Sequence, residues 1–475
     1  MTTPISKIIR NKLREFSTSS MAFTVGLVLM LNLLSSCEQF IEVDLPNSQL
    51  TTEAVFTEKA TAEAALLAIY AQMRDRGILR DLYYEMGLYT DELEFYGSST
   101  SSKEAFHKNN LIPSHPTVSS WWNTTYTQIY GANALLKGLE ESALDEAFKK
   151  QLNGEALFIR GLNQFYLTVL YGEVPYVTST DYQQNTVLSK IPIQEVFKKV
   201  EADLTQAIAL LDWEYSTADR TRATKGVALA ALARVSLYTG DWQQAVDATT
   251  AIINHSDLYE WETDLNKVFL KESRSTLWQF SPRGAGVNTP EAISFIFNTA
   301  PPPTVALTPN LVSSFKDADQ RLAQWIQEVS NGSQSYYHPF KYKTRGNTSS
   351  SVEYSILFRM AEVYLIRSEA YARLDQLELA SLDLNIVRGR AGLTDVEYST
   401  KEELLEQILI ERRHELFTEA GQRFFDLKRS NRLDAVLEPL KAGWKPTNQL
   451  LPLPENELII NPNLAPQNPG YQSGN

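Results

Sequence analysis

Residues 223–254 read ATKGVALAALARVSLYTGDWQQAVDATTAIIN, and this stretch decides the fold. Small apolar residues such as Ala231 recur at helical spacing until residues 239–241, Thr-Gly-Asp, interrupt the pattern. A second helical pattern follows over residues 242–253, and a glycine directly after a periodic segment is typical of a helix end. Alanines at the contact positions, Ala245 among them, let two helices approach closely. The stretch therefore predicts two helices packed as a hairpin.

Residues 356–391 repeat this arrangement. The two units align so that Arg234 and Tyr238 of the first match Arg367 and Tyr371 of the second. A unit of about 34 residues has the period of tetratricopeptide repeats, whose helix pairs bury their faces by stacking on neighbours. The alternative is a pair of unrelated helical hairpins.

Helical periodicity extends over much of the remaining chain. It predicts further helices over residues 57–75, 122–141, 145–171, 192–212, 400–419 and about 421–438. Residues 94–121 are rich in serine and lack this periodicity, so we interpret them as a long loop. The fold class we expect is mainly α, with tetratricopeptide-like helix pairs forming a scaffold over about 57–254 and 354–438.

Residues 255–352 differ in composition from the helix pairs. They contain many prolines and polar residues, with short β-like runs at 276–280 and 293–297. We expect a loop-rich, irregular half with a few short strands here. Residues 451–475 form a Pro/Asn-rich tail, which we expect not to be helical because proline breaks helices.

The composition excludes several classes of function. The chain of 475 residues has 44 Lys+Arg against 57 Asp+Glu, a net charge of -13, which argues against nucleic acid as a partner. Five histidines and one cysteine exclude a disulfide framework and a thiolate-rich metal site. The motifs of serine hydrolases, zinc proteases and nucleotide-binding loops do not occur. We therefore expect no enzyme activity, no cofactor and no catalytic metal.

The N-terminal segment indicates export. Residues 1–20 carry four basic residues, and residues 21–34 are nearly all apolar, which is the pattern of a secretory signal. The segment ends in Leu-Ser-Ser-Cys, which resembles a bacterial lipobox. We therefore expect residues 1–36 to be a lipoprotein signal peptide and Cys37 to carry the lipid anchor of a single domain, residues 37–475. The alternative is an ordinary signal peptide with a chance cysteine.

Blocks of sequence along the chain resemble the SusD/RagB family of outer-membrane nutrient-binding lipoproteins. The C-terminal blocks are IERRHEL (410–416), GQRFFDLKR (421–429), LPLPENE (451–457), NPNL (461–464) and QNPGY (467–471). Upstream blocks are YGEVP (171–175), TPNLV (308–312) and LFRMAEVYLIRSEA (357–370). The similarity covers nearly the whole chain, from the lipobox to the tail.

The resemblance implies a fold, a partner and a ligand class. The family fold is four tetratricopeptide-like helix pairs that carry an irregular ligand-binding half. The implied partner is a SusC-like TonB-dependent outer-membrane transporter, over which the lipoprotein sits as a lid at the cell surface. The implied ligand is a glycan, or a peptide in RagB-like members. A helical-repeat scaffold without a small ligand is the remaining alternative.

The charged residues of the 410–416 block have two interpretations. Glu411, Arg412, Arg413 and Glu415 interleave acids and bases at helical spacing on one predicted helix. Such spacing favours ion pairs that brace neighbouring helices over a pair of catalytic carboxylates. We therefore predict a structural role for this block.

Aromatic residues in the predicted loops are the candidate ligand contacts. Sugar sites combine aromatic rings with polar side chains, because a sugar offers apolar C–H faces and many hydroxyls. The segments 94–121, 281–306 and 331–350 supply such rings, which are Phe95, Tyr96, Phe295, Phe297, Tyr336 and Tyr337. The alternative for each ring is packing in a small core beneath a long loop.

Lipidation of Cys37 is directly testable. We expect the N-terminal peptide of the mature protein to begin at Cys37 and to carry the added mass of acyl chains, because these hold the protein at the membrane. Mass spectrometry of the wild-type protein and of Cys37→Ala measures this mass. An N-terminal peptide without lipid in the wild-type protein would contradict the prediction.

Overall fold

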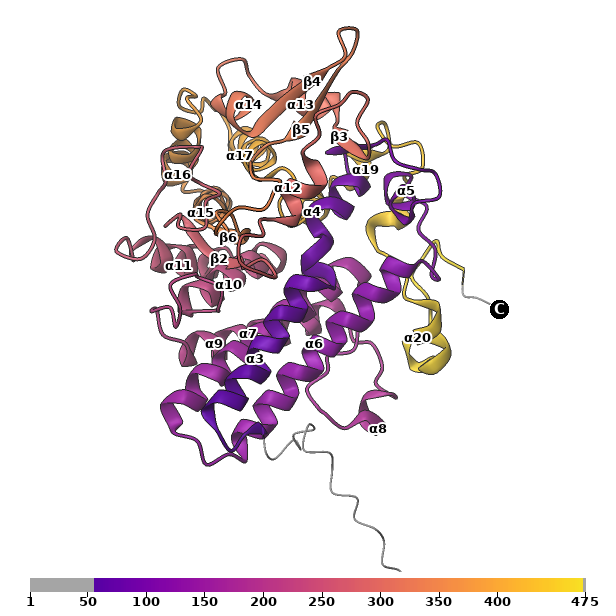
Figure 1. Cartoon of the computed structure of the whole chain (residues 1–475), viewed down its shortest axis with the longest axis vertical. Coiled ribbons are helices and arrows are strands. Elements are labelled where there is room, and N and C mark those ends of the chain that lie inside the picture. Colours follow the sequence, from indigo (N-terminus) through magenta and orange to yellow (C-terminus); the bar gives the residue numbers. More distant parts are fainter. Residues whose placement is uncertain (1–54, 473–475) are drawn as a thin grey trace, which may run out of the picture. The chain divides into compact units, whose positions relative to one another are not determined.

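The structure, a computed structural model, describes residues 55–472, which lie within one compact unit running from Thr52 to Asn475 (Figure 1). Cys37 and the expected signal peptide lie outside the described residues. The described part is mainly helical with a few short strands, so the predicted fold class is confirmed. None of the helices in this part is both long and apolar enough to cross a membrane.

Four helices of the N-terminal half pack side by side. They are α3 (Lys59–Asp75), α6 (Pro116–Glu140), α7 (Glu146–Tyr171) and α9 (Ile193–Leu210). Helix α3 packs on α6, α6 on α7 and α7 on α9. The predicted helices are confirmed, but α6 begins earlier than residue 122. Proline at its first position and the His115 ring, which accepts a hydrogen bond from the Thr117 backbone N–H at 3.3 Å, start the helix at Pro116.

The two predicted helix pairs form and stack on each other. The first is α10 (Lys225–Thr239) with α11 (Trp242–Ile253), and the second is α15 (Met360–Arg373) with α16 (Leu377–Arg390). Gly240 ends α10 with a φ of 75°, a left-handed conformation that glycine adopts without strain. Helix α11 packs directly on α15, and α17 (Lys401–Leu416) covers α15 and α16. Helices separated by more than a hundred residues therefore form one continuous scaffold.

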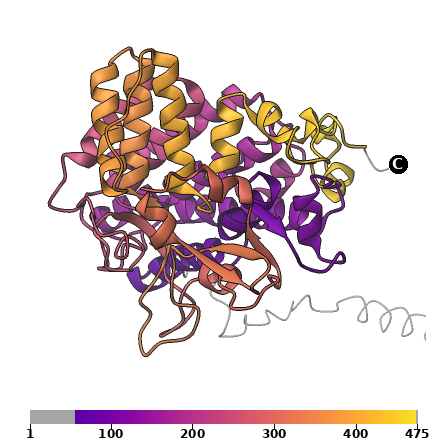
Figure 2. The ribbon, with the colours of Figure 1, turned by 90° about the horizontal axis from the view of Figure 1, so that it is seen from above.

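Within the described residues, the short strands form three antiparallel pairs, two of which join distant parts of the chain while the third is a local hairpin. Strand β1 (Leu93–Phe95) pairs with β3 (Val305–Leu307), β2 (Thr276–Phe280) with β6 (Ser355–Arg359), and β4 (Ile326–Ser330) with β5 (Ser335–Pro339). Strand β2 confirms the β-like run predicted at 276–280. Strands β3 to β5 gather with the short helices α12 to α14 beside the scaffold (Figures 1 and 2).

Several short helices were not predicted. The segment 94–121, expected to be a loop, contains the end of β1, α5 (Ser102–His107) and the start of α6, and it follows α4 (Ile78–Tyr89). The run at 293–297 lies largely in α12 (Pro290–Phe295) and is not a strand, because Pro290 occupies the first turn and the Thr289 hydroxyl accepts the Ala292 N–H. The other short elements are α8 (Tyr182–Asn185), α13 (Pro309–Ser314), α14 (Gln320–Trp325) and the 3-10 helix η1 (Pro446–Gln449).

The C-terminal region also differs from expectation. The helix predicted at 421–438 is two helices, α18 (Gln422–Arg429) and α19 (Leu433–Leu437), separated by Asn431 with a φ of 56°. The tail contains α20 (Glu455–Ile460) and the 3-10 helix η2 (Pro462–Leu464). Its prolines flank α20 and do not interrupt it, so a proline-rich composition did not prevent a helix here.

A buried ion cluster joins the C-terminal helices to the irregular half. Glu415 on α17 binds Arg321 at 3.0 Å and Arg359 at 2.6 Å, and it also binds Arg390. All four side chains are buried. Burial alone would raise the pKa of Glu415, but the three guanidinium groups outweigh burial and hold this pKa well below its ordinary value.

The neighbouring charges of α17 are paired in the same way. Glu411 binds Arg321 at 2.7 Å, and Arg388 at 3.3 Å. Arg412 binds Asp426 and Arg413 binds Asp91, each at 2.8 Å. The predicted structural role of the 410–416 block is therefore confirmed.

We expect Glu415→Gln to lower the free energy of unfolding by about 3–5 kcal/mol, because it leaves buried arginines without their shared partner. Glu406 lies on the same helix, but its ion pair with Arg432 is solvent-facing, with side chains 41% and 42% exposed. Glu406→Gln is the matched control and should cost less than about 1 kcal/mol. Chemical denaturation measures the free energy of unfolding of both variants. Equal losses of this free energy in Glu415→Gln and Glu406→Gln would contradict the dominant role of Glu415.

Candidate ligand-binding site

Three segments that are far apart in the sequence surround one hollow of about 470 Å³, which we call the β1–α12 hollow. Helix α4 contributes Tyr84 to its wall, and the volume is in the range of small-molecule sites. The remaining lining residues are Phe95, Gly97, Ser98, Ser101, Lys103, Ile293, Ser294, Ile296, Phe297, Pro303, Thr304 and Arg345. They belong to segments 94–121, 281–306 and 331–350, the same three that supply the candidate rings.

Backbone pairing holds the first two segments together. Phe95 is opposite Val305 in the β1–β3 ladder, and the Tyr96 N–H donates to the Thr304 carbonyl at 2.7 Å just beyond it. The Ser101 hydroxyl accepts the Lys103 backbone N–H at 3.3 Å and starts α5. The wall of the hollow is therefore fixed by secondary structure on the side of β1 and α5.

The candidate rings differ in their exposure. Phe95 is half-buried and lines the hollow, and Tyr96 is 38% exposed between two lining residues. The Tyr96 ring contacts the Tyr336 ring edge to face, with centroids 5.5 Å apart. Tyr96 is thus the most exposed of the candidates, while Phe95 lines the hollow and also packs against the main core, and contact of either ring with a ligand stays a prediction.

The other four candidates are mainly packing residues in this structure. Phe295 is buried between Tyr83 and Tyr84, with ring centroids at 5.4 and 5.9 Å. Tyr337 is half-buried against the main core. Phe297 and Tyr336 are buried in a small separate cluster, although Phe297 reaches the hollow. The alternative of a small core beneath a loop therefore describes these four rings better than open ring surfaces do.

Sequence reasoning missed part of the wall. Tyr84 lies on α4, which was not predicted, and Lys103 lies in a serine-rich segment without periodicity. The Lys103 Nζ atom is 3.4 Å from the centroid of the Tyr84 ring and 3.8 Å from Glu85. Burial raises the pKa of Glu85 to about 7, and Lys103 opposes this shift. A periodic apolar pattern after Gly77 was the available signal for α4.

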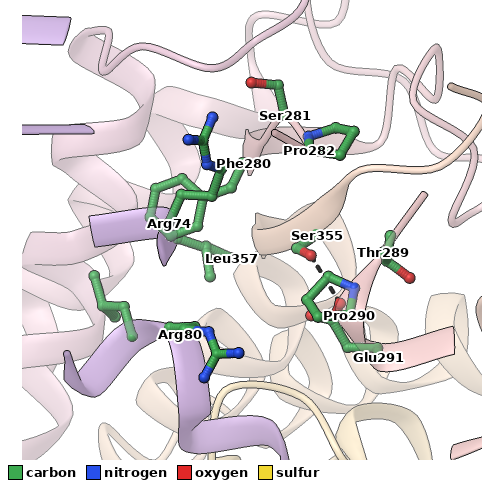
Figure 3. Close-up of a pocket in the computed structure, with 11 residues that line it drawn as sticks. Arg74, Arg80, Phe280, Ser281, Pro282, Thr289, Pro290, Glu291, Ser355 and Leu357 are labelled. Carbon is green, nitrogen blue, oxygen red and sulfur yellow. Dashed lines mark hydrogen bonds between the residues drawn. The ribbon is translucent and has the colours of Figure 1, made fainter. Parts of the chain in front are cut away.

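A second hollow is much smaller. It has a volume of about 40 Å³ and lies near Arg74, Arg80 and Glu291 (Figure 3). The Ser355 hydroxyl donates to the Glu291 carboxyl group at 2.7 Å, and burial raises the pKa of Glu291 to about 7. This volume suits a few water molecules and is too small for a sugar ring.

A third concave region, the α6–α8 groove, has a volume of about 520 Å³. Trp122, Tyr126 and Tyr130 of α6 line it together with Tyr182 of α8, and the tail around α20 forms its other side. Tyr130 is 49% exposed and Tyr182 is 70% exposed. Trp122, Tyr126 and Tyr130 lie in the helix predicted over residues 122–141 and were not among the candidates, and neither was Tyr182.

Within residues 55–472, no group of three or more His, Cys, Asp or Glu side chains is arranged to hold a metal ion. His414 is bound to the Ser314 hydroxyl at 2.9 Å and stacks on Phe315. Burial, together with the nearby arginines, lowers the pKa of His414 to about 3.

Known proteins are similar to this chain over nearly its full length. Residues 39–237 match a family model described as "Starch-binding associating with outer membrane", and residues 321–471 match a model described as "SusD family". SusD-like protein P2 of Formosa agariphila is 27% identical, over 94% of this chain and 99% of its own.

Solved structures share the fold. A laminarin binding SusD-like protein superposes with a TM-score of 0.74 at 24% identity, covering 88% of this chain and all 100% of its own. Surface glycan-binding protein A from Bacteroides thetaiotaomicron has a TM-score of 0.73 at 18% identity, over 87% of this chain and 100% of its own. Both halves of the chain thus match one family in sequence, and the whole matches it in fold. The chain belongs to the SusD/RagB family.

Proposed function

We propose that this protein is a lipid-anchored glycan-binding protein of the outer membrane. It captures oligosaccharides or polysaccharides in the β1–α12 hollow and delivers them to a SusC-like TonB-dependent transporter. The observation that carries the proposal is the convergence of three distant segments on one hollow of about 470 Å³. The names of the laminarin-binding and surface glycan-binding relatives support a glycan as the ligand class.

The lining of the β1–α12 hollow suits a sugar. Phe95 and the neighbouring Tyr96 offer ring surface for apolar C–H faces. Ser98, Ser101 and Thr304 contribute side-chain hydroxyls, which act both as donors and as acceptors toward sugar hydroxyls. The hollow therefore combines the two kinds of contact that sugar binding requires.

The same lining supports binding without catalysis. Glycoside hydrolysis in most families needs two carboxyl groups on either side of the scissile bond. None of the described residues that line the β1–α12 hollow is Asp, Glu or His. A glycan bound in the hollow would therefore meet no pair of carboxyl groups of the kind that glycoside hydrolysis uses.

The anchor and the transporter complete the proposal. The family model for residues 39–237 is described as associating with the outer membrane, which supports this location. A lipid on Cys37 would keep the protein at that membrane. A binding protein held beside a transporter raises the local ligand concentration at the transporter entrance. A peptide ligand, as in RagB-like members, is the alternative outcome of the binding test below.

We expect Tyr96→Ala and Phe95→Ala each to weaken glycan binding by about 1–2 kcal/mol, because stacking rings lose their contact with a sugar face on truncation. Calorimetry with the best ligand from a combined glycan and peptide array measures the loss. Tyr130→Ala and Tyr182→Ala, in the α6–α8 groove, are matched controls and should bind like the wild type. The opposite pattern would place the site in that groove, and selection of peptides by the array would exclude a glycan.

A further inference from the structure

The β1–α12 hollow is positively charged in an acidic protein. We infer that it selects anionic glycans, whose sugar units carry carboxylate or sulfate groups, through Lys103 and Arg345. This inference rests on the proposed glycan binding and adds the ligand class to it. Carboxylate and sulfate present the same chemistry to these two side chains, since both are anionic groups with several acceptor oxygens.

The charge of the lining is opposite to that of the chain. Acidic residues outnumber basic ones by 57 to 44 over the whole chain. Among the residues that line the β1–α12 hollow, the only groups charged at neutral pH are Lys103 and Arg345. A concave site with charges of one sign concentrates the field inside it, and this favours ligands of the opposite sign.

Lys103 is held in place without being fully neutralised. Its ammonium group lies 3.4 Å from the centroid of the Tyr84 ring, so the ring fixes its position. The nearest carboxylate, Glu85, is 3.8 Å away and only 8% exposed. Burial raises the pKa of Glu85 to about 7, so this carboxyl group carries only part of a negative charge at neutral pH. The side chain of Lys103 remains 38% exposed toward solvent.

Arg345, which lines the same hollow, is also available for a ligand. Its side chain is exposed and makes no ion pair or hydrogen bond with the residues at 55–472. Arg321 and Arg359, by contrast, are buried and each binds carboxylates. A free guanidinium group binds carboxylate or sulfate oxygens through two parallel hydrogen bonds, and a neutral sugar offers no such partner.

The α6–α8 groove provides an internal comparison. It is lined by aromatic and neutral polar side chains, and its one charged lining residue is Glu457. Aromatic rings therefore line both sites. Of the two sites, only the β1–α12 hollow is lined by cationic side chains, which are Lys103 and Arg345. The positive charge therefore belongs to the β1–α12 hollow and is not shared by the α6–α8 groove.

Calorimetry on the detergent-solubilised full chain tests the inference with three probes, namely hexagalacturonate, a sulfated neocarrageenan hexasaccharide and neutral neoagarohexaose. We expect at least one anionic probe to bind about tenfold or more tightly than the neutral one. Its affinity should fall as sodium chloride rises from about 50 to about 500 mM, because exposed charges are screened. The two anionic probes distinguish a carboxylate from a sulfate preference.

Lys103→Gln and Arg345→Gln should each weaken binding of the anionic probe by about fivefold to tenfold and leave the neutral probe unchanged. Lys103→Arg keeps the charge and should keep the affinity, which controls for folding. Lys108→Gln is the matched control, because Lys108 is exposed, pairs with Glu104 at 2.9 Å and does not line the hollow.

The variants distinguish failure of this inference from failure of the proposed function. Suppose that neutral and anionic probes bind with equal affinity, and that Tyr96→Ala lowers this affinity while the Gln variants do not. This result would overturn the inference but would still support glycan binding in the hollow. Binding that neither Tyr96→Ala nor the Gln variants change would overturn both. Loss of anionic binding in the two Gln variants alone would support the inference.

Discussion

Three arginines share one buried carboxylate, and the attachment of the irregular half to the helical scaffold depends on this contact. Glu415 lies near the end of α17, while Arg321, Arg359 and Arg390 come from α14, the end of β6 and the end of α16. A buried charge without a partner costs several kcal/mol, so none of these side chains is stable there alone. Arg321 and Arg359 also pair with Glu411 and Glu419, and together these contacts fix where four separate elements meet.

The cluster also reaches the β1–α12 hollow. Lys341, which follows β5, donates to the backbone carbonyls of Glu415 and Phe417, each at 2.8 Å. Arg345 lies four residues further along the same segment. The segment that carries Arg345 is thereby tied to the end of α17, while the β1–β3 ladder holds the wall at Phe95. A buried ion cluster and a short strand pair thus both help to position the residues that line the hollow.

The scaffold was predictable because long helices leave a periodic pattern, and small residues such as Ala231 mark the contacts between them. Helices α4, α12 and α20 were missed, since short helices depend on caps and on tertiary packing more than on periodicity. The three segments named for their loop aromatic residues all contribute to the hollow, although 94–121 is not the long loop expected, and ligand contact by their rings stays a prediction. The exposure of single rings was not predictable. Phe295 and Phe297 are buried because the irregular half builds small cores of its own, and no pattern in the sequence separates such rings from open ones.

The β1–β3 pairing has a consequence for biogenesis. Leu93 is opposite Leu307, so the wall of the hollow closes only after more than two hundred intervening residues have been added to the chain. Contacts so distant in sequence form late, because the entropy of closing a long loop must be overcome first. During synthesis, the N-terminal helices can assemble while the hollow does not yet exist. The hollow therefore forms only after the chain has been made at least as far as Arg345, and a chain that ends before β3 would keep its N-terminal helices without the hollow.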